Sequence, residues 1–236
     1  MDVFTPFVNN TGGTKPHNQT GLPRMQPTSR CAALRPAQVC SRPAGSPSHL
    51  IDDSRRNRYF TSMKVYTLGE EVLREKAVPV AEITDEIRTL ISDMFVQMKL
   101  SDGIGLAAPQ IGKSLRLFVV QADDDVERAF INPQIIETST ELCSYEEGCL
   151  SVPKYYEEVV RPERITVQAL NERGRRFTLE ADGLLARVIQ HEYDHLDGIL
   201  FIDRIAPDKK DKIVHKFREK AEKEQKKAEK TATKDS

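Results

Sequence analysis

The sequence has few cysteines and no long apolar run. Four cysteines in 236 residues are too few for a disulfide scaffold, which indicates a reducing compartment. Spacing alone leaves open a bond between Cys143 and Cys149. No apolar run approaches the roughly 18–20 residues that cross a bilayer, so we predict no membrane span. Residues 1–62 also have no apolar core of the kind that a secretory signal needs, which argues against that class.

Charge is distributed unevenly along the chain. The net charge is -1, but residues 1–62 hold eight Lys/Arg against three Asp/Glu, and residues 207–236 hold eleven against seven. The stretch 63–206 is therefore acidic, with sixteen Lys/Arg against twenty-six Asp/Glu. An acidic body argues against a general nucleic-acid-binding surface, and we expect no DNA partner.

The first 62 residues contain seven of the thirteen prolines and no sustained hydrophobic period. Such a composition predicts a disordered extension, because it buries too little apolar surface to offset the entropy of ordering. Two explanations remain open. Either Met63 is the true start and the protein is cytoplasmic, or the Arg-rich, acid-poor stretch is a transit peptide to a plastid or mitochondrion.

The sequence predicts two helices in the body of the chain. The first has Thr84 as its N-cap and ends at the glycines of 103–105. The second is expected from the cap Asp182 to about Asp197, just before Gly198. The apolar face of the first helix has steps of three and four, through Ile87, Leu90, Ile91, Met94, Phe95 and Met98.

Several shorter segments predict strands. Residues 115–120 and 130–131 are rich in branched and aromatic side chains, and Asn132-Pro133 is expected to end the second of them. Residues 165–170 and 176–180, joined by a turn, predict a hairpin.

The segment 191–195 reads His-Glu-Tyr-Asp-His. On a helix, residues four apart lie on one face, so His191 and His195 can reach one metal ion while Glu192 lies beside them. The alternative is an exposed helix with two ordinary histidines. The apolar stretch 184–189 favours a buried helix, in which histidines need partners.

A hydrolytic metal site usually has three protein ligands. Some zinc proteases place the third one six residues after the second histidine, where this chain has Phe201, which cannot ligate. Glu219 and Glu222 lie in a lysine-dense tail. Cys149, in Glu-Gly-Cys-Leu-Ser at 147–151, offers a thiolate. By itself, a buried cysteine in a strand is more often a core residue.

Residues 103–110 read Gly-Ile-Gly-Leu-Ala-Ala-Pro-Gln. The glycines would let the backbone approach a ligand closely, and Gln110 could offer its amide to a developing oxyanion. The alternative is a loop with a segment of small residues that pack.

Segments 103–110, 147–151 and 191–195 resemble, in order, the G-x-G-x-A-A-x-Q, E-G-C-x-S and H-E-x-x-H motifs of peptide deformylases. The similarity extends from residue 63 to about 208. It implies an α+β fold in which mixed or antiparallel sheets surround the helix that carries H-E-x-x-H. It also implies an enzyme that removes the formyl group from the N-terminal methionine of new polypeptides, releasing formate.

The resemblance assigns roles to motif residues. Glu192 would transfer protons, while the Gln110 side chain and the Leu150 backbone N–H would hold the oxyanion. One ferrous ion per chain, with zinc or another divalent metal as the alternative, would be bound by Cys149, His191 and His195.

The substrate residues follow from the same resemblance. Gly105 would hydrogen-bond the peptide backbone, Ile104 and Val188 would form walls of the methionine pocket, and Arg187 would lie at its rim. No role is assigned to two residues in a variable stretch, Tyr156 and Arg161.

We expect residues 63–206 to form the catalytic domain and 207–236 a basic helical tail with Ile213 and Phe217 as apolar anchors. As in some relatives, the tail could dock near the nascent-chain exit of the ribosome; the alternative is a solvated helix without a partner. Two rival functions are a zinc endopeptidase, against which the missing ligand at Phe201 argues, and a non-catalytic peptide-binding relative, against which the complete motifs argue.

Overall fold

A computed structural model describes the backbone of residues 63–232 and the side chains up to residue 223. The extension 1–62 predicted above lies outside the described residues. None of the described helices is long and apolar enough to cross a membrane. The elements are η2 (Glu71–Leu73), α1 (Asp85–Leu100), β1 (Gly105–Ala107), η3 (Ala108–Ile111), β2 (Leu117–Val120), β3 (Arg128–Thr138), β4 (Leu142–Cys149), β5 (Val152–Pro162), β6 (Ile165–Leu170), β7 (Arg176–Ala181), α2 (Gly183–Leu196), η4 (Phe201–Asp203) and α3 (Pro207–Ala232).

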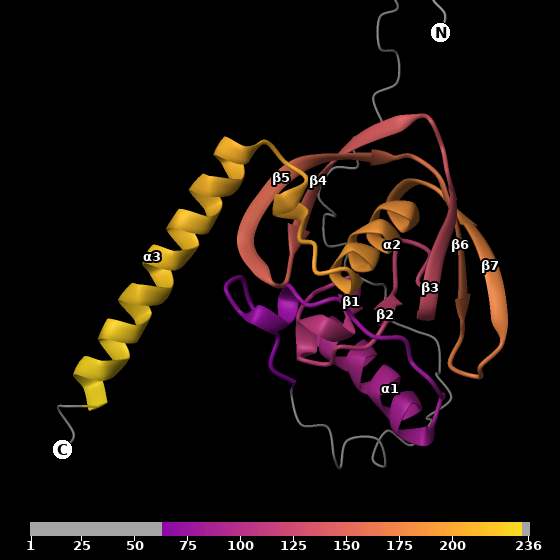
Figure 1. The fold of residues 1–236 in the computed structure, drawn as a ribbon, viewed down its shortest axis with the longest axis horizontal. Helices are drawn as coiled ribbons and strands as arrows, with labels where there is room; N and C mark the ends of the chain where they lie inside the picture. The colour runs from indigo at the N-terminus through magenta and orange to yellow at the C-terminus, as the bar shows by residue number, and fades with distance from the viewer. Residues whose placement is uncertain (1–62, 233–236) are drawn as a thin grey trace, which may run out of the picture. The chain divides into compact units, whose positions relative to one another are not determined.

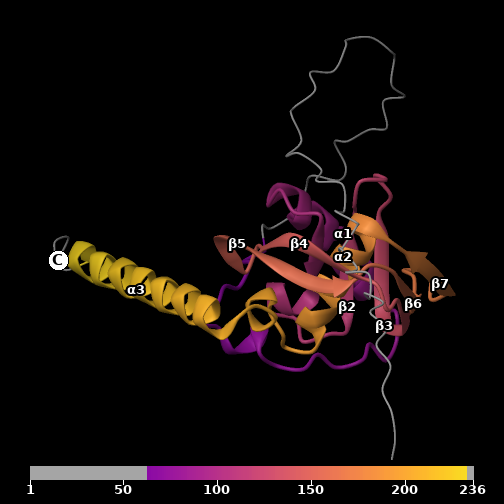
Figure 2. The same ribbon diagram turned by 90° about the horizontal axis from the view of Figure 1, so that it is seen from above.

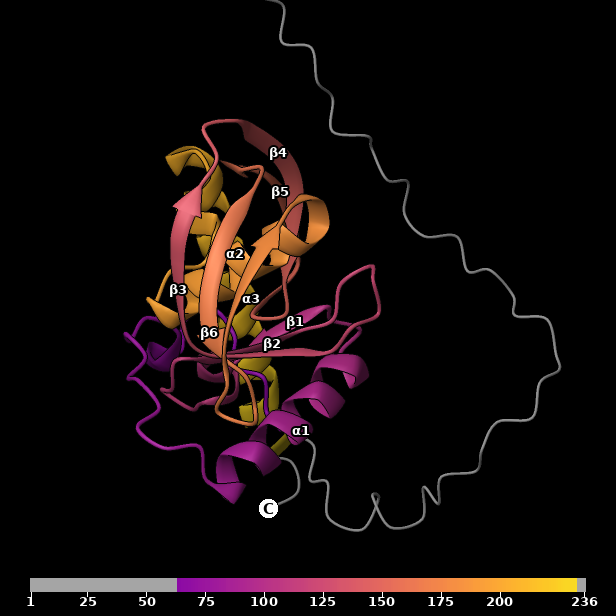
Figure 3. The ribbon, with the colours of Figure 1, turned by 90° about the vertical axis from the view of Figure 1, so that its right-hand side faces the viewer.

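The strands form two sheets (Figure 1). Five strands pair in the order β1-β2-β3-β6-β7, and β4 pairs with β5 in a separate ribbon. Every pairing between these strands is antiparallel. Figure 3 shows β3, β6 and β7 side by side, with the β6–β7 hairpin that the sequence predicts. The expected α+β class is confirmed, in its antiparallel form.

Strand β2 is buried on both faces because a helix covers each of them. Phe118 and Val120 pack into a cluster with α2, whereas Leu117 and Val119 pack into a cluster with α1. Successive side chains of a strand point to opposite faces, so a continuous apolar run suits this position. The sheet therefore fixes α2 from one side.

The opposite side of α2 is held by the β4–β5 ribbon. The Arg187 guanidinium donates a hydrogen bond to the carbonyl of Val159 (3.0 Å), and the Gln190 side chain donates one to the carbonyl of Pro162 (3.0 Å). Helix α2 thus lies between the two sheets (Figure 1), as the resemblance implies for the helix that carries the paired histidines.

Both predicted helices of the body are confirmed. Helix α1 follows Thr84 and ends at Leu100, a little before the glycines of 103–105. Helix α2 follows Asp182 and ends before Gly198. Gly198 has φ +71°, and a Cβ there would lie 2.5 Å from the carbonyl oxygen of Arg74, so glycine is required at this exit.

One expectation is wrong, and one possibility that the sequence left open is excluded. Asn132-Pro133 does not end its strand, because β3 continues to Thr138 across an irregularity in its pairing with β6. Asn132 takes up a positive φ of 50° there, and its side chain bonds both backbone groups of Val80 at 2.8 Å. The Cys143–Cys149 bond left open above does not form, because Cys149 is a free thiol.

Helix α3 begins beside η4 and β5 (Figure 2). Its residue Ile213 is buried in a cluster with Val159 of β5 and Leu200, and the Lys209 ammonium lies 2.6 Å from the Glu157 carboxylate. The anchor predicted at Ile213 is confirmed. Phe217 is half-buried but lies outside this cluster, into which Val214 packs instead.

Candidate metal centre and active site

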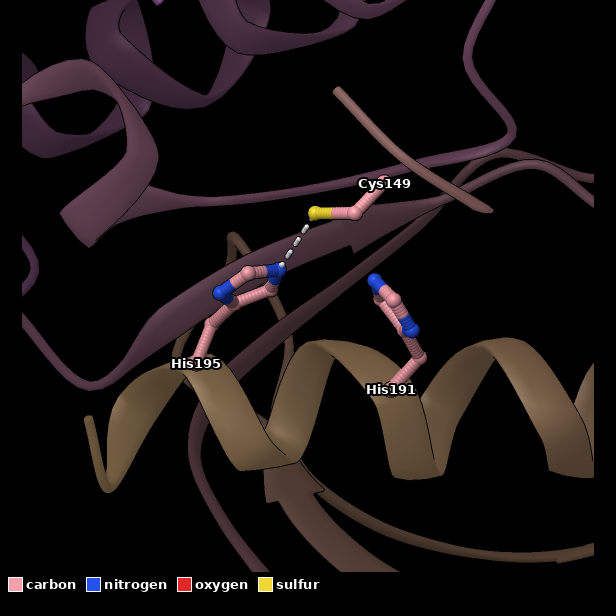
Figure 4. A group of neighbouring side chains, drawn as sticks. All are labelled: Cys149, His191 and His195. Atoms are coloured by element: carbon pink, nitrogen blue, oxygen red, sulfur yellow. Dashed lines mark hydrogen bonds between the residues drawn. The ribbon is translucent and has the colours of Figure 1, made fainter. Parts of the chain in front are cut away.

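Cys149, His191 and His195 converge on one point. The cysteine ends β4, and the histidines lie one turn apart on α2, with both rings projecting toward the strand (Figure 4). Their ligand atoms all lie within 4.8 Å of one another, and the Cys149 sulfur is 3.2 Å from Nε2 of His195. One sulfur and two imidazole nitrogens at this spacing suit a single ion such as Zn²⁺ or Fe²⁺.

His191 is oriented by a buried carboxylate. Its Nδ1 lies 2.8 Å from the Glu147 carboxylate, which leaves Nε2 for a metal. The Arg161 guanidinium donates to both oxygens of Glu147, at 2.7 and 2.9 Å. Burial alone would raise the pKa of Glu147, but the hydrogen bonds from His191 and Arg161 outweigh burial and hold the pKa well below its usual value. The carboxylate is therefore ionised.

The Glu147 pair belongs to a larger buried network. Arg187 donates to Glu147 at 2.9 Å, and Arg161 donates to Asp194 at 2.6 Å. Asp194 also accepts hydrogen bonds from Arg204. Buried charges are costly unless they are paired and hydrogen-bonded, and each of these has partners. The network joins β4, β5 and α2 directly behind the metal ligands.

Two observations fit a metal ion at this point. Within the described chain, Oε2 of Glu192 is buried beside the ligands without a hydrogen-bond partner. Burial opposes ionisation of the Cys149 thiol, yet the neighbouring His195 and His191 rings outweigh it and hold the thiol pKa well below its usual value. A thiolate is the form that binds a metal.

Glu192 points into the space beside the ligands. It is buried at the side of α2, and a Cβ on Gly105 would lie 2.4 Å from its Oε1. Glycine is therefore the residue that β1 can place against this carboxylate. Burial raises the pKa of Glu192 to about 7, which suits a group that must accept and release a proton near neutral pH.

The Gln110 side chain is aimed at the sulfur. Its Oε1 accepts a hydrogen bond from the Ala107 backbone N–H at 2.8 Å, which turns the amide nitrogen toward Cys149. That nitrogen lies 3.6 Å from the sulfur and 3.2 Å from the Ser151 hydroxyl. The amide is thus oriented by the backbone and can donate to a ligand beside the metal ligands.

A cavity of about 420 Å³ opens over these groups. Cys149, His191, Glu192 and Gln110 line it, and its apolar walls include Ile104 and Val188. The predicted residues Gly105, Leu150 and Arg187 line the same cavity, and so does Tyr156, to which the sequence assigned no role. The remaining predicted ligand, His195, lies beside Cys149 but does not line the cavity. A volume of this size suits a small organic group or one amino-acid side chain with its neighbouring backbone.

Comparisons with known proteins agree with this arrangement. The sequence model of the family described as polypeptide deformylase matches residues 62–211. The chain is 53% identical over 155 residues to a peptide deformylase of Treponema pallidum, which covers 66% of this chain and 95% of that protein. A peptide deformylase of Acinetobacter baumannii is 48% identical over 176 residues, or 73% of this chain and 98% of that protein.

The crystal structure of a peptide deformylase from Legionella pneumophila superimposes with a TM-score of 0.64 at 42% identity, covering 67% of this chain and 96% of that one. This chain belongs to the peptide deformylase family. The deformylase is a hydrolase that removes the N-formyl group, and the family's substrates are formylated nascent peptides. Its Cys/His/His site is of the metal-binding type typical of the family. The endopeptidase and the non-catalytic alternatives are thereby set aside.

The structure also explains the positions that raised doubt about a third ligand. Phe201 stacks on the His191 ring, with 6.3 Å between ring centroids, so it packs against a ligand in place of being one. Glu219 lies on α3, where its carboxylate is 3.2 Å from His215 and both side chains are exposed.

Sequence reasoning missed the residues behind the ligands. Arg161, to which no role was assigned, is 4% exposed and holds Glu147. Arg187 lines the cavity, but it is buried in the same network and does not lie on an open rim. One available signal was an arginine between Val160 and Pro162 in a strand, where a buried charge implies a buried partner.

We expect Arg161→Met to weaken both folding and metal binding. The substitution removes one of the two guanidinium groups that pair with each of Glu147 and Asp194 in a buried site, which should cost up to about 3–5 kcal/mol of unfolding free energy. Loss of support for a metal-ligating histidine should lower metal affinity about 10–100-fold. Urea denaturation and metal titration measure the two effects.

The matched control is Arg164→Met. Arg164 pairs with Glu141 at 2.8 Å, but its side chain is 55% exposed. This variant should lose about 1 kcal/mol or less. Equal losses in the two variants would contradict the importance of the buried network.

Proposed function

We propose that Cys149, His191 and His195 hold one divalent ion, ferrous iron with zinc as the alternative, at which a formyl-methionyl peptide is deformylated. The convergence of these three ligand atoms within 4.8 Å carries the proposal. When bound, such an ion would supply Lewis acidity, which makes water acidic enough to act as a nucleophile near neutral pH.

Glu192 is the proposed proton carrier. It is buried, it adjoins the ligands on α2, and one of its oxygens has no partner in the described chain. Its carboxylate accepts the proton of the attacking water and then delivers it to the amine that leaves as the formyl C–N bond breaks. A group that acts as base and then as acid works best with a pKa near the working pH, and burial places that of Glu192 at about 7.

Gln110 and Leu150 are the proposed oxyanion donors. The Gln110 amide nitrogen is already turned toward Cys149 by its bond with Ala107. Leu150 directly follows Cys149 and lines the same cavity, so its backbone N–H lies next to a metal ligand. Such donors stabilise the charge that develops on the formyl oxygen, each by about 2.7–4 kcal/mol.

The substrate backbone is proposed to lie along β1. This strand is at the end of the five-stranded sheet, and among residues 63–232 its one strand partner is β2. A peptide can therefore add to its other edge through hydrogen bonds with Gly105. The methionine side chain then enters between Ile104 and Val188, which line the cavity.

Helix α3 is proposed to dock near the nascent-chain exit of the ribosome, since it is rich in exposed lysines. Long-range attraction to RNA phosphates is the physical basis of this proposal. A solvated helix without a partner is the alternative.

Two substitutions separate the roles of the site residues. Glu192→Ala should keep its metal and lower kcat about 10²–10⁴-fold, because only proton transfer is removed. Cys149→Ala should lose the metal, as elemental analysis would show. If Glu192→Ala keeps more than about a tenth of wild-type turnover, Glu192 is not the proton carrier. If Cys149→Ala keeps its full metal content, Cys149 is not a metal ligand and is only a core residue.

The identity of the ion is tested by handling in air. With ferrous iron, formate release should decay in air and persist under anaerobic purification, because Fe²⁺ is oxidised whereas Zn²⁺ is not. Metal analysis of both preparations is the companion measurement. Activity that is stable in air, with zinc in the protein, would favour the alternative metal.

The role of α3 is tested by a truncation that keeps the first turns of the helix, which pack against the body. Ile213 and Val214 pack against the body, so the tail should be truncated after Phe217. We expect this enzyme to retain activity on a short formyl peptide and to lose co-sedimentation with ribosomes at low salt. If the truncated enzyme co-sediments as well as the full chain, α3 does not dock on the ribosome and is a solvated helix.

A further inference from the structure

The pairing of β4 with β5 is irregular at the mouth of the cavity. Gly148 pairs with Tyr156, but the next residue, Cys149, pairs with Val152. Residues 153–155 therefore bulge out of the ribbon. Bulges beside active sites commonly re-aim a side chain, and all three of these residues line the cavity.

Lys154, in the middle of this bulge, has a left-handed backbone with φ +72°. The other described non-glycine residues with positive φ are Asp102, Asp125 and Asn132. Aspartate and asparagine tolerate this conformation because their short side chains bond locally, whereas a lysine is strained and a glycine would not be. Strain retained beside a binding cavity points to a role for the side chain.

The Lys154 side chain is exposed and makes no hydrogen bond or ion pair with any other described residue. By contrast, Lys209 of α3 is paired with Glu157, which lies on the same strand as Lys154. The Lys154 ammonium is thus available to a ligand that passes through the mouth of the cavity.

The charged residues that line the cavity differ in how far they are buried. Arg187 is buried, and its guanidinium is committed to Glu147 and to two carbonyl oxygens. On the exposed rim, the described lining residues that carry charge are Asp102, Glu146 and Lys154. Lys154 is the single cation among them, and the two carboxylates disfavour an acidic ligand elsewhere on the rim.

We propose that Lys154 is a specificity-determining residue that binds acidic side chains downstream of the formyl-methionine in the peptide substrate. The inference rests on the proposal that this cavity takes up the formyl-methionine. The formyl group then lies at the metal ligands and the methionine side chain lies between Ile104 and Val188, so the residues that follow are the ones that can reach Lys154. An aspartate or glutamate there pairs with the ammonium.

The test compares peptides that differ only in one charge. The substrates are formyl-Met-Asp-Ser-amide against formyl-Met-Asn-Ser-amide, and formyl-Met-Ala-Asp-amide against formyl-Met-Ala-Asn-amide; the amides remove the terminal carboxylate. At one position or both, wild-type kcat/KM should favour aspartate about two- to fivefold, the effect of an exposed ion pair. The preference should shrink at high salt.

Lys154→Gln should abolish this preference, Lys154→Glu should reverse it, and Lys154→Arg should keep it. Lys154→Gly fits the left-handed backbone without strain and should lose the preference without loss of thermal stability. The matched control is Lys113→Gln, an exposed lysine outside the cavity, which should behave as the wild type.

All variants should hydrolyse neutral formyl-Met-Ala-Ser-amide at the wild-type rate. If the wild type does not hydrolyse this neutral peptide, the proposed deformylation is contradicted. That outcome differs from a failure of the Lys154 proposal, in which the neutral peptide is still hydrolysed. The proposal is overturned if the aspartate-to-asparagine ratios of the wild type, Lys154→Gly and Lys154→Glu are equal at both positions.

Discussion

The site depends on one carboxylate that is kept ionised inside the protein. Glu147 lies between an imidazole on its metal side and two guanidinium groups on its other side. Without the arginines its burial would favour the neutral acid, which could not orient His191 in the same way. The strand that supplies Glu147 also supplies Cys149, two residues later, so a single ion-paired residue sets the register between strand and helix that brings the thiol to the imidazoles.

The surrounding fold also keeps the charged residues of α2 buried. Helix α2 is covered by the five-stranded sheet on one side and by the β4–β5 ribbon on the other, which removes water from its polar residues. Such burial would be costly for an ordinary surface helix. Here each charged group either has a partner in the network or faces the cavity, where a ligand, a metal or a substrate proton can satisfy it.

The sequence allowed prediction of the elements whose patterns are local. The apolar period of α1, the cap and the glycine exit of α2, and the β6–β7 hairpin could be recognised because each depends on residues that are close in sequence. Strands β4 and β5 were not, because their residues alternate between the arginine network and solvent and so carry charges at buried positions such as Arg161. The motif residues could be recognised one by one. Their support could not, since the contacts of Arg161 with Glu147 and Asp194 span 14 and 33 residues of sequence.

The two ligand imidazoles are not equivalent. His191 has its outer nitrogen fixed by Glu147, whereas the corresponding nitrogen of His195 has no partner within the described chain. The protein thus dictates the tautomer of one ring and leaves that of the other to the ion. The fold thus holds one ring through a hydrogen bond at its outer nitrogen, and it holds the other, which is 1% exposed, through packing around that nitrogen.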